Sequence, residues 1–545
     1  MNQSHDDLTA PPDLRLDQAR GGPARTHRPV YLDLLPPCNA GCPAGENIQQ
    51  WLALTHAGDH ESAWRSLVAA NPLPAVHGRV CYHPCESVCN RAELDSPVSI
   101  HAVERFLGDL ALERGWRFDP PPASSGRRVL VVGAGPSGLS AAYHLARLGH
   151  HVVVHDAEPE PGGMMRYGIP AYRLPRDVLA AEIARIAALG VEIVGDHPVR
   201  DLVAERRDGR FDAVFVAVGA HLSKRVDIPA REAGRIVDAV GLLHSVAAGE
   251  RPTIGRRVAV YGGGNTAMDA ARVARRLGAE EALVVYRRTR AQMPAHPEEA
   301  DEAEREGVRI NWLRTIQAFD GPNLTVEVME IDAEGRPVPT GRTETLTADT
   351  VVLALGQRAD TAFLRGVPGI AFTPDGTVVV SAQLMTGCAG VFAGGDMVPA
   401  ERTVTVAVGH GRTAARHIDA YLRGLSPTEP APPPIADFGG LHPWYFTDAG
   451  RRRQTERDPG RRLADFTEVV SGLGADAAGY EAARCLSCGT CFECDSCLGS
   501  CPEDAVIKIG PGDRYRFDYT RCTGCGTCFD QCPVHPITMI PEATP

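Results

Sequence analysis

Short apolar runs alternate with longer amphipathic stretches between Arg127 and about Leu425. The runs are rich in Val, Ala and Leu, as buried strands are, and the stretches between them have the length and spacing of helices. Strands that alternate with helices are typical of α/β domains built on a parallel sheet. We therefore predict an α/β fold for this central part of the chain.

The region before it has a different pattern. Residues 31–120 contain two helix-like stretches, Ile48 to Ala57 and Ile100 to Leu112, and end at the helix-breaking sequence PPPASSG. They predict a small helical domain. Residues 1–30 are polar and rich in Pro and Gly, so we expect them to be disordered.

Composition and charge narrow the class of protein. The chain has 545 residues, of which 43% are hydrophobic and 23% charged, which suits three or four ordinary globular domains. The net charge of -12 and the lack of a long basic run argue against nucleic acid as a partner. The N-terminus lacks the apolar core of a signal peptide, and no window approaches the roughly 18 apolar residues that cross a bilayer. We expect a cytoplasmic protein that does not contact a membrane.

A complete dinucleotide-binding fingerprint opens the α/β region. In RRVLVVGAGPSGLSAAYHLARLGHHVVVHDAEP, a strand leads into Gly133, Gly135 and Gly138, which have the spacing GxGxxG, and a helix and a second strand ending at Asp156 follow. The first glycine permits a tight turn, the second lets the backbone approach a pyrophosphate, and the third lets the helix pack on the strand. Asp156 is placed to accept hydrogen bonds from an adenosine ribose.

A second fingerprint, of the form GxGxxA, follows in RRVAVYGGGNTAMDAARVARRLGAEEALVVYRRTR. Its second strand ends at Tyr286 and is followed by two arginines instead of an acid. Arginine there favours an adenosine 2′-phosphate, hence NADP over NAD, although solvated charges after a strand are the alternative. The predicted NAD(P) contacts are Gly262, Gly264, Asn265, Thr266, Ala267, Arg287 and Arg288.

Two dinucleotide folds, the second nested in the first, resemble the plan of the two-domain flavin disulfide reductases. VVLALGQ and GVFAGGD resemble the returning segment of that superfamily, in which the Asp contacts the flavin ribityl chain and the next helix, here TVTVAVGHGRTAA, points at the isoalloxazine. The resemblance implies an FAD domain at residues 127–248 and 346–425 and an NAD(P) domain at 249–345. The residues assigned to FAD are Gly133, Gly135, Pro136, Ser137, Gly138, Asp156, Gly163, Gly395, Asp396 and Val404. No CxxxxC redox disulfide follows the first fingerprint, so electrons must leave the flavin by another route.

The 16 cysteines gather in short-spaced runs near both ends of the chain, which indicates metal and not disulfides. After a Pro-rich linker predicted for residues 426–480, residues 481–545 contain two CxxCxxCxxxCP runs. This is the pattern of bacterial two-cluster ferredoxins, in which the fourth cysteine of each run ligates the other cluster, and it does not fit the separated CxxC pairs of zinc sites. The two predicted [4Fe-4S] sites are Cys491, Cys494, Cys497 and Cys532, and Cys522, Cys525, Cys528 and Cys501.

The N-terminal cysteines carry a further resemblance. PPCNAGCPAGENI, GRVCYHPCESVCNR, PVSIHAVERF, YGIPAYRLP, GGGNTAMDAA and YRRTRAQMPA are together similar to the NADPH-dependent glutamate synthase small subunit over residues 31–425. The same module occurs in the large subunit of the NADH-dependent ferredoxin:NADP transhydrogenase and in the N-terminal part of dihydropyrimidine dehydrogenase. The resemblance implies up to two N-terminal clusters. It assigns to one of them Cys42, Cys81 and Cys85, with Glu104 as the non-cysteine ligand.

The other N-terminal cluster would have only Cys38 and Cys89, because the family's first CxxC is missing here. The missing segment usually reads like EAxRCLxC, and YEAARCLSC occurs near the C-terminus, where Cys485 and Cys488 are surplus to the ferredoxin pattern. We hypothesise that these two cysteines complete the cluster, from the same chain or from a dimer partner. The alternative is one N-terminal cluster or none, with the leftover cysteines as small buried hydrophobic residues.

These sites predict an oxidoreductase that transfers electrons between NADP(H), or NAD(H), and a ferredoxin-type one-electron carrier through FAD and [4Fe-4S] clusters. By family analogy, the ferredoxin tail implies a subunit of a larger complex, such as a 2-oxoacid:ferredoxin oxidoreductase, or a partner of soluble ferredoxin. Homo-oligomerisation is left open. The other two functions that we consider are a glutamate synthase small subunit and a redox-sensing iron-sulfur scaffold.

Overall fold

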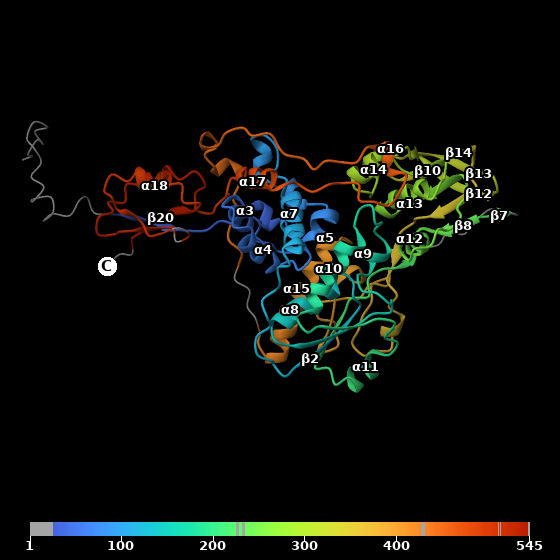
Figure 1. Cartoon of the computed structure of the whole chain (residues 1–545), viewed down its shortest axis with the longest axis horizontal. Helices are drawn as coiled ribbons and strands as arrows, with labels where there is room; N and C mark the ends of the chain where they lie inside the picture. The colour runs from blue at the N-terminus through green and yellow to red at the C-terminus, as the bar shows by residue number, and fades with distance from the viewer. Residues whose placement is uncertain are drawn as a thin grey trace, which may run out of the picture.

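The computed structural model describes residues 25–224, 228–231, 235–426, 431–510, 512 and 514–542. A small C-terminal domain and the second α/β domain lie at opposite ends of the molecule, and the N-terminal helical domain and the first α/β domain lie between them (Figure 1). Within the described ranges, no helix combines the length and the apolar character needed to cross a membrane.

The predicted helical domain is present. Two of its helices begin at the predicted residue and end within one residue of the predicted end, and Trp51, Trp64 and Leu107 are fully buried in its core. Its helices are α2 (Pro37–Ala40), α3 (Ile48–His56), α4 (His60–Val68), α5 (Pro74–Val80), α6 (Pro84–Ser87) and α7 (Ile100–Glu113), with a 3-10 turn η1 at Asn90–Glu93.

The first α/β domain contains a parallel sheet in the order β17-β5-β2-β3-β4. Val129, Leu130 and Val131 are fully buried in its central strand, because helices cover both faces of such a sheet. Its strands are β2 (Arg128–Val132), β3 (His151–His155), β4 (Glu192–Val194), β5 (Ala213–Val216) and β17 (Val391–Ala393). Its helices are α8 (Pro136–Arg147), α9 (Met164–Tyr167), α10 (Arg176–Ala187), α11 (Leu202–Asp208) and α15 (Val404–Arg423).

The second α/β domain has a parallel sheet in the order β11-β10-β9-β15-β8 and an antiparallel sheet, β14-β13-β12, whose edge pairs with β7. The parallel strands are β8 (Arg235–Asp238), β9 (Arg257–Tyr261), β10 (Glu281–Tyr286), β11 (Arg309–Trp312) and β15 (Thr350–Leu353). The helices are α12 (Ala239–Ala247), α13 (Asn265–Arg276) and α14 (Pro297–Arg305). The other strands are β7 (Ala230–Arg231), β12 (Arg314–Asp320), β13 (Asn323–Ile331) and β14 (Pro337–Thr347).

The predicted boundaries between the two α/β domains are wrong. β8, α12 and β15 belong to the second domain, although residues 127–248 and 346–425 were predicted to form the first. The VVLALGQ segment supplies β15, which pairs with β8 and β9. Both sheets are built from buried apolar strands, so the local pattern does not indicate which sheet a strand joins. The chain passes between the domains at β6 (Leu222–Ser223) and β16 (Gln357–Arg358), which pair antiparallel.

The C-terminal domain contains α18 (Ser496–Gly499), α19 (Thr527–Asp530), β18 (Val506–Lys508), β19 (Tyr515–Phe517) and β20 (Ile537–Pro541). The prediction of disorder for residues 1–30 is wrong for its last part, because β1 (His27–Tyr31) pairs antiparallel with β20. The backbone groups at the edge of β20 gain partners in this way. The first 24 residues lie outside the described residues.

The segment predicted as a linker, residues 426–480, contacts the rest of the chain at several points along its described length. Leu35 and Ile435 form a bridge, and Val469 is buried and donates its N–H to the Tyr172 carbonyl at 2.9 Å. Arg462, in the short helix α16 (Pro459–Arg462), pairs with Glu456, which also pairs with Arg305 of α14. Helix α17 (Ala475–Ala483) crosses the predicted boundary at residue 481 and packs on α3 and α7. Composition predicted a linker because Pro-rich sequence lacks periodicity, but the segment is ordered by tertiary contacts.

Helix α15 joins the first α/β domain to the helical domain through two glycines. A Cβ on Gly411 would stand 2.3 Å from the Ser137 carbonyl oxygen in α8, and a Cβ on Gly409 would stand 2.0 Å from the Pro43 carbonyl oxygen. Real Cβ atoms do not approach backbone atoms so closely. Only glycine therefore permits α15 to lie against both neighbours.

We expect Gly409→Ala to destabilise the protein by about 1–3 kcal/mol, because the new methyl group must push α15 away from Pro43. Gly479→Ala in α17 is the matched control, since a Cβ at Gly479 meets nothing within 4 Å and alanine favours a helix by about 0.5–1 kcal/mol. Thermal unfolding followed by circular dichroism should show a lower melting temperature for Gly409→Ala alone. Equal melting temperatures for Gly409→Ala and wild type would contradict this packing.

Candidate functional site

The first fingerprint forms a cradle at the carboxyl end of β2. Gly135 is the N-cap of α8, and a Cβ placed on it meets no atom within 4 Å, so open space lies in front of the helix N-terminus. Gly138 is packed so tightly that a Cβ would stand 1.9 Å from the Gly133 carbonyl oxygen. Open space before free backbone N–H groups at a helix N-terminus fits a pyrophosphate. Pro136 and Ser137 form the first turn of this helix.

Two further glycines close the cradle. Gly163 has φ +51°, which favours glycine, and a Cβ on it would stand 2.9 Å from Gly135 Cα. Gly395 has φ +72°, and its Cβ position lies 3.1 Å from Ser137 Cβ. The structure thus brings segments more than 200 positions apart in the sequence to one glycine-lined surface, as the flavin-domain resemblance implies.

Two carboxylates belong to this cradle. Asp156 accepts hydrogen bonds from the N–H groups of Ala134 and Glu158, so its predicted contact with the ribose stays a prediction. Asp396, in the 3-10 turn η4 (Gly395–Met397), makes no hydrogen bond to any residue within the described ranges, and burial raises its pKa to about 6 against the opposing charge of Arg402. A half-buried carboxylate without a hydrogen bond to the described residues fits contact with a polar ligand such as the ribityl chain. Val404 begins the next helix, α15.

The second fingerprint forms a similar cradle at the carboxyl end of β9. Gly264 is the N-cap of α13 with open space in front of it, and Ala267 is fully buried behind it. The Asn265 side-chain oxygen accepts the His296 N–H at 2.8 Å, and Thr266 accepts from the Gln357 amide at 3.2 Å. The side chains of Asn265 and Thr266 are therefore both hydrogen-bonded to neighbouring loops.

The two arginines after β10 have different exposures. Arg287 is exposed and Arg288 is half-buried, and neither forms an ion pair with an acid among the described residues. Guanidinium groups without an acidic partner fit a phosphate, which suits the predicted 2′-phosphate site.

The C-terminal cysteines form two groups in the crossed pattern of two-cluster ferredoxins. After burial, the charges of Cys532, Cys491 and Cys494 are the main causes that raise the pKa of the Cys497 thiol to about 12, so these four thiols lie together. Cys501, Cys522, Cys525 and Cys528 line one small cavity. We call Cys491, Cys494, Cys497 and Cys532 set A, and Cys501, Cys522, Cys525 and Cys528 set B.

A third group, set C, consists of Cys42, Cys81, Cys85 and Glu104. Burial and then the charges of Glu86, Cys81, Cys42 and Glu104 raise the pKa of the Cys85 thiol well above its usual value, which places the set together as the family resemblance implies. Glu104 is 5% exposed and accepts from the Asn71 amide at 2.8 Å. Thiolates and a carboxylate in one buried group form a donor set that suits an iron-sulfur cluster.

Sequence reasoning missed Glu46. Its carboxylate shares the Asn71 amide with Glu104, at 3.0 Å, and after burial its charge is the main cause that raises the pKa of the Cys42 thiol. Burial raises the pKa of Glu46 to about 7. No sequence motif marks Glu46 as a site residue, because it lies near set C only through the fold of the loop that contains Cys42.

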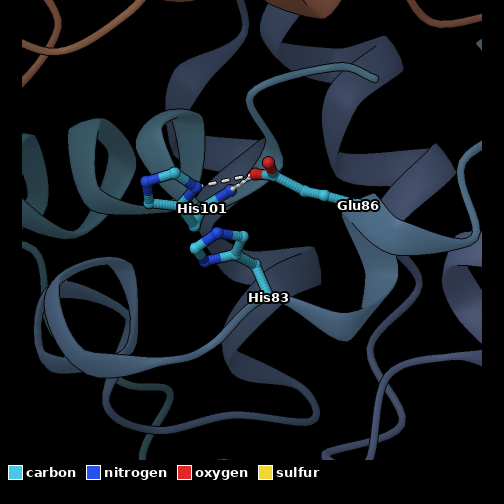
Figure 2. Close-up of side chains that lie close together, drawn as sticks. All are labelled: His83, Glu86 and His101. Atoms are coloured by element: carbon cyan, nitrogen blue, oxygen red, sulfur yellow. Dashed lines mark hydrogen bonds and ion pairs between the residues drawn. The ribbon is translucent and has the colours of Figure 1, made fainter. Parts of the chain in front are cut away.

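His83, Glu86 and His101 lie close together (Figure 2), and Glu86 directly follows Cys85 of set C in the sequence. The Glu86 carboxylate faces His101 and accepts from its backbone N–H at 3.0 Å and its Nδ1 at 2.7 Å, and it also pairs with Arg451. Burial works against ionisation, but His101, His83 and Arg451 lower the pKa of Glu86 to about 2. The carboxylate thus accepts two hydrogen bonds from His101 and pairs with Arg451, and these contacts fix the loop that contains Cys85.

The fourth group, set D, consists of Cys38, Cys89, Cys485 and Cys488, which line a second small cavity. The structure brings these cysteines together within one chain, as the hypothesis on YEAARCLSC requires. Two anchors hold the segment in place. Glu481 accepts from the Ser99 N–H at 2.9 Å, and Arg484 is 2% exposed and donates to Asp95 at 3.0 Å. Cluster ligation by set D stays a proposal.

Three family models match the chain. Residues 127–411 match the pyridine nucleotide-disulphide oxidoreductases, residues 33–116 match domain II of dihydropyrimidine dehydrogenase with its 4Fe-4S cluster, and residues 515–538 match a 4Fe-4S binding domain. The chain belongs to the pyridine nucleotide-disulphide oxidoreductase family. It is an FAD- and iron-sulfur-dependent NAD(P)H oxidoreductase with an N-terminal and a C-terminal 4Fe-4S region.

Relatives of known role confirm the resemblance. Subunit beta of the NADP(+)-dependent formate dehydrogenase of Moorella thermoacetica is 40% identical over 498 residues, which cover 83% of this chain and 70% of the relative. Subunit beta of the NADPH-Fe(3+) oxidoreductase of Geobacter sulfurreducens is 34% identical over 86% of this chain and 77% of its own length. The small chain of the NADPH glutamate synthase of Azospirillum brasilense is 34% identical over 71% of this chain and 87% of its own length.

We expect a Cys485→Ser, Cys488→Ser double variant to lose one cluster, so that iron falls from about sixteen to about twelve atoms per chain, assuming four-iron clusters. Iron analysis and electron paramagnetic resonance of anaerobically purified protein measure this. Cys388→Ser is the matched control, because Cys388 lies outside all four sets. A double variant that keeps every cluster would show that set D holds none.

Proposed function

We propose that this chain is the NADP(H)-reactive electron-transfer subunit of a larger oxidoreductase. The observation that supports it most is the contact between the flavin cradle and set C. Thr405, in the first turn of α15, donates its hydroxyl to Cys81 Sγ at 3.0 Å, and Gly409 of the same helix packs against the Cys42–Pro43 loop. One helix therefore borders both the cradle and set C.

The spatial order of the sites supports the same proposal. The NAD(P) domain and the C-terminal domain lie at opposite ends, with the flavin cradle and the helical domain between them (Figure 1). Cys488 of set D is buried in one hydrophobic cluster with Cys497 of set A and Cys528 of set B. Cys525 of set B is exposed, whereas the other cysteines are buried or half-buried. Set B is thus the site from which electrons would leave the molecule.

When bound, FAD exchanges a hydride with the nicotinamide and single electrons with the clusters. The chain itself binds and orients these groups and adjusts their reduction potentials. The Thr405 hydroxyl and the His83 N–H both donate to Cys81 Sγ, at 3.0 and 3.2 Å, and such hydrogen bonds to cluster sulfur set reduction potentials. No side-chain acid or base is needed for the transfer.

The relatives support a partner protein, because two of them are named as beta subunits and one as a small chain. The 40% identity over 83% of this chain makes another subunit of a formate dehydrogenase the first candidate for this partner. A 2-oxoacid:ferredoxin oxidoreductase or soluble ferredoxin remains a prediction from domain architecture alone.

The purified chain should reduce a one-electron acceptor of high potential, such as ferricyanide, when NADPH is added under anaerobic conditions. The reason is that the chain contains both a dinucleotide site and the exposed set B. Acceptor absorbance measures the rate, and the absence of any dinucleotide-dependent reduction would refute the proposed function.

We expect an Arg287→Ala, Arg288→Ala double variant to lose affinity for NADPH by at least about tenfold and to keep its affinity for NADH, since a charge-assisted hydrogen bond to phosphate contributes about 1.5–3 kcal/mol. KM values for both dinucleotides measure this. Arg290→Ala is the control, because Arg290 already pairs with Asp301 and Glu304. A wild-type protein that uses NADH alone, or a variant with unchanged KM for NADPH, would overturn the assignment.

A further inference from the structure

The segment Pro170–Leu174 of the flavin domain inserts an aromatic ring into the NAD(P) domain. Tyr172 is 0% exposed, and its ring centre lies 3.8 Å from Cζ of Arg276 and 4.6 Å from Cζ of Arg272. Its hydroxyl donates to Asp269 at 3.2 Å. All three partners belong to α13, the helix that begins at the second fingerprint.

The next residue, Arg173, contacts three parts of the molecule at once. It donates to the other oxygen of Asp269 at 2.9 Å and pairs with Glu299 of α14. It also interacts with the Tyr82 side chain, on the loop between Cys81 and Cys85 of set C. The Arg173 side chain is 11% exposed, and both carboxylates are buried.

Tyr82, in the helical domain, adds a contact to the NAD(P) domain next to Arg173. Its ring stacks on His296 with centroids 4.7 Å apart and planes 14° apart. The His296 N–H in turn donates to Asn265, the first residue of α13. Arg173 and Tyr82 therefore connect the set C loop to the first turn of the NAD(P)-binding helix.

We propose that Arg173 is the positioning residue that fixes the NAD(P) domain relative to the flavin cradle for hydride transfer. This inference rests on the proposed function. Removing the guanidinium leaves the buried Asp269 and Glu299 carboxylates without this cation, and burying such charges is costly, so α13 and α14 must shift or take in water. Because α13 begins at the dinucleotide cradle, its displacement moves the nicotinamide, and a misplacement of about 1 Å can cost about a hundredfold in rate.

Anaerobic stopped-flow reduction of the flavin by saturating NADPH tests this role. Arg173→Gln should lower the limiting rate by about tenfold to a hundredfold, with the Kd for NADP+ and the iron content unchanged. Arg173→Lys, which keeps one charge, should recover part of the rate. Arg185→Gln is the matched control, because the Arg185 side chain is 7% exposed and lies beside the buried Glu182 carboxylate within α10, outside α13 and α14.

An unchanged limiting rate in Arg173→Gln, or an equal loss in Arg185→Gln, would overturn the proposal. A wild-type protein that NADPH does not reduce would refute the proposed function instead. Hydrogen-deuterium exchange would then decide the role of Arg173. Faster exchange of α14 and the Cys81–Cys85 loop in Arg173→Gln would support it, and wild-type exchange there would overturn it.

Discussion

The close packing of α15 on two backbones is the contact on which the arrangement of redox sites depends. Gly411 permits the approach to α8, whose first turn forms the flavin cradle, and Gly409 permits the approach to the loop that contains Cys42. A side chain at either position would separate the two surfaces. The flavin cradle and set C therefore share one rigid helix, and the hydroxyl of Thr405 on that helix reaches a sulfur of set C.

On the side of the helical domain away from the flavin cradle, the N-terminal and C-terminal segments together place the other cysteine sets. Buried Glu481 and Arg484 dock the C-terminal segment on the helical domain, so that Cys485 and Cys488 meet Cys38 and Cys89. The pairing of β1 with β20 ties the C-terminal domain to the start of the same chain. The ferredoxin-like domain is thus held by two connections, which keeps sets A and B next to set D.

The sequence was most informative where function requires a fixed local spacing. The GxGxxG turn and the CxxCxxCxxxCP runs encode geometry within one loop and helix, so Gly135, Gly264 and the crossed grouping of sets A and B could be predicted. Contacts between segments that are distant in the sequence could not be predicted in this way. The membership of β15 in the second sheet, the strand at His27–Tyr31 and the buried Glu46 all depend on tertiary packing that no short pattern encodes.

The most direct test of a relay through set C is stopped-flow absorbance of a Cys85→Ser variant mixed anaerobically with NADPH. The account predicts that the flavin still bleaches at the wild-type rate, because its cradle is intact, while the clusters of sets A and B stay oxidised on the timescale of wild-type reduction. Reduction of those clusters at the wild-type rate in the variant would contradict the relay, since electrons would then leave the flavin by another route.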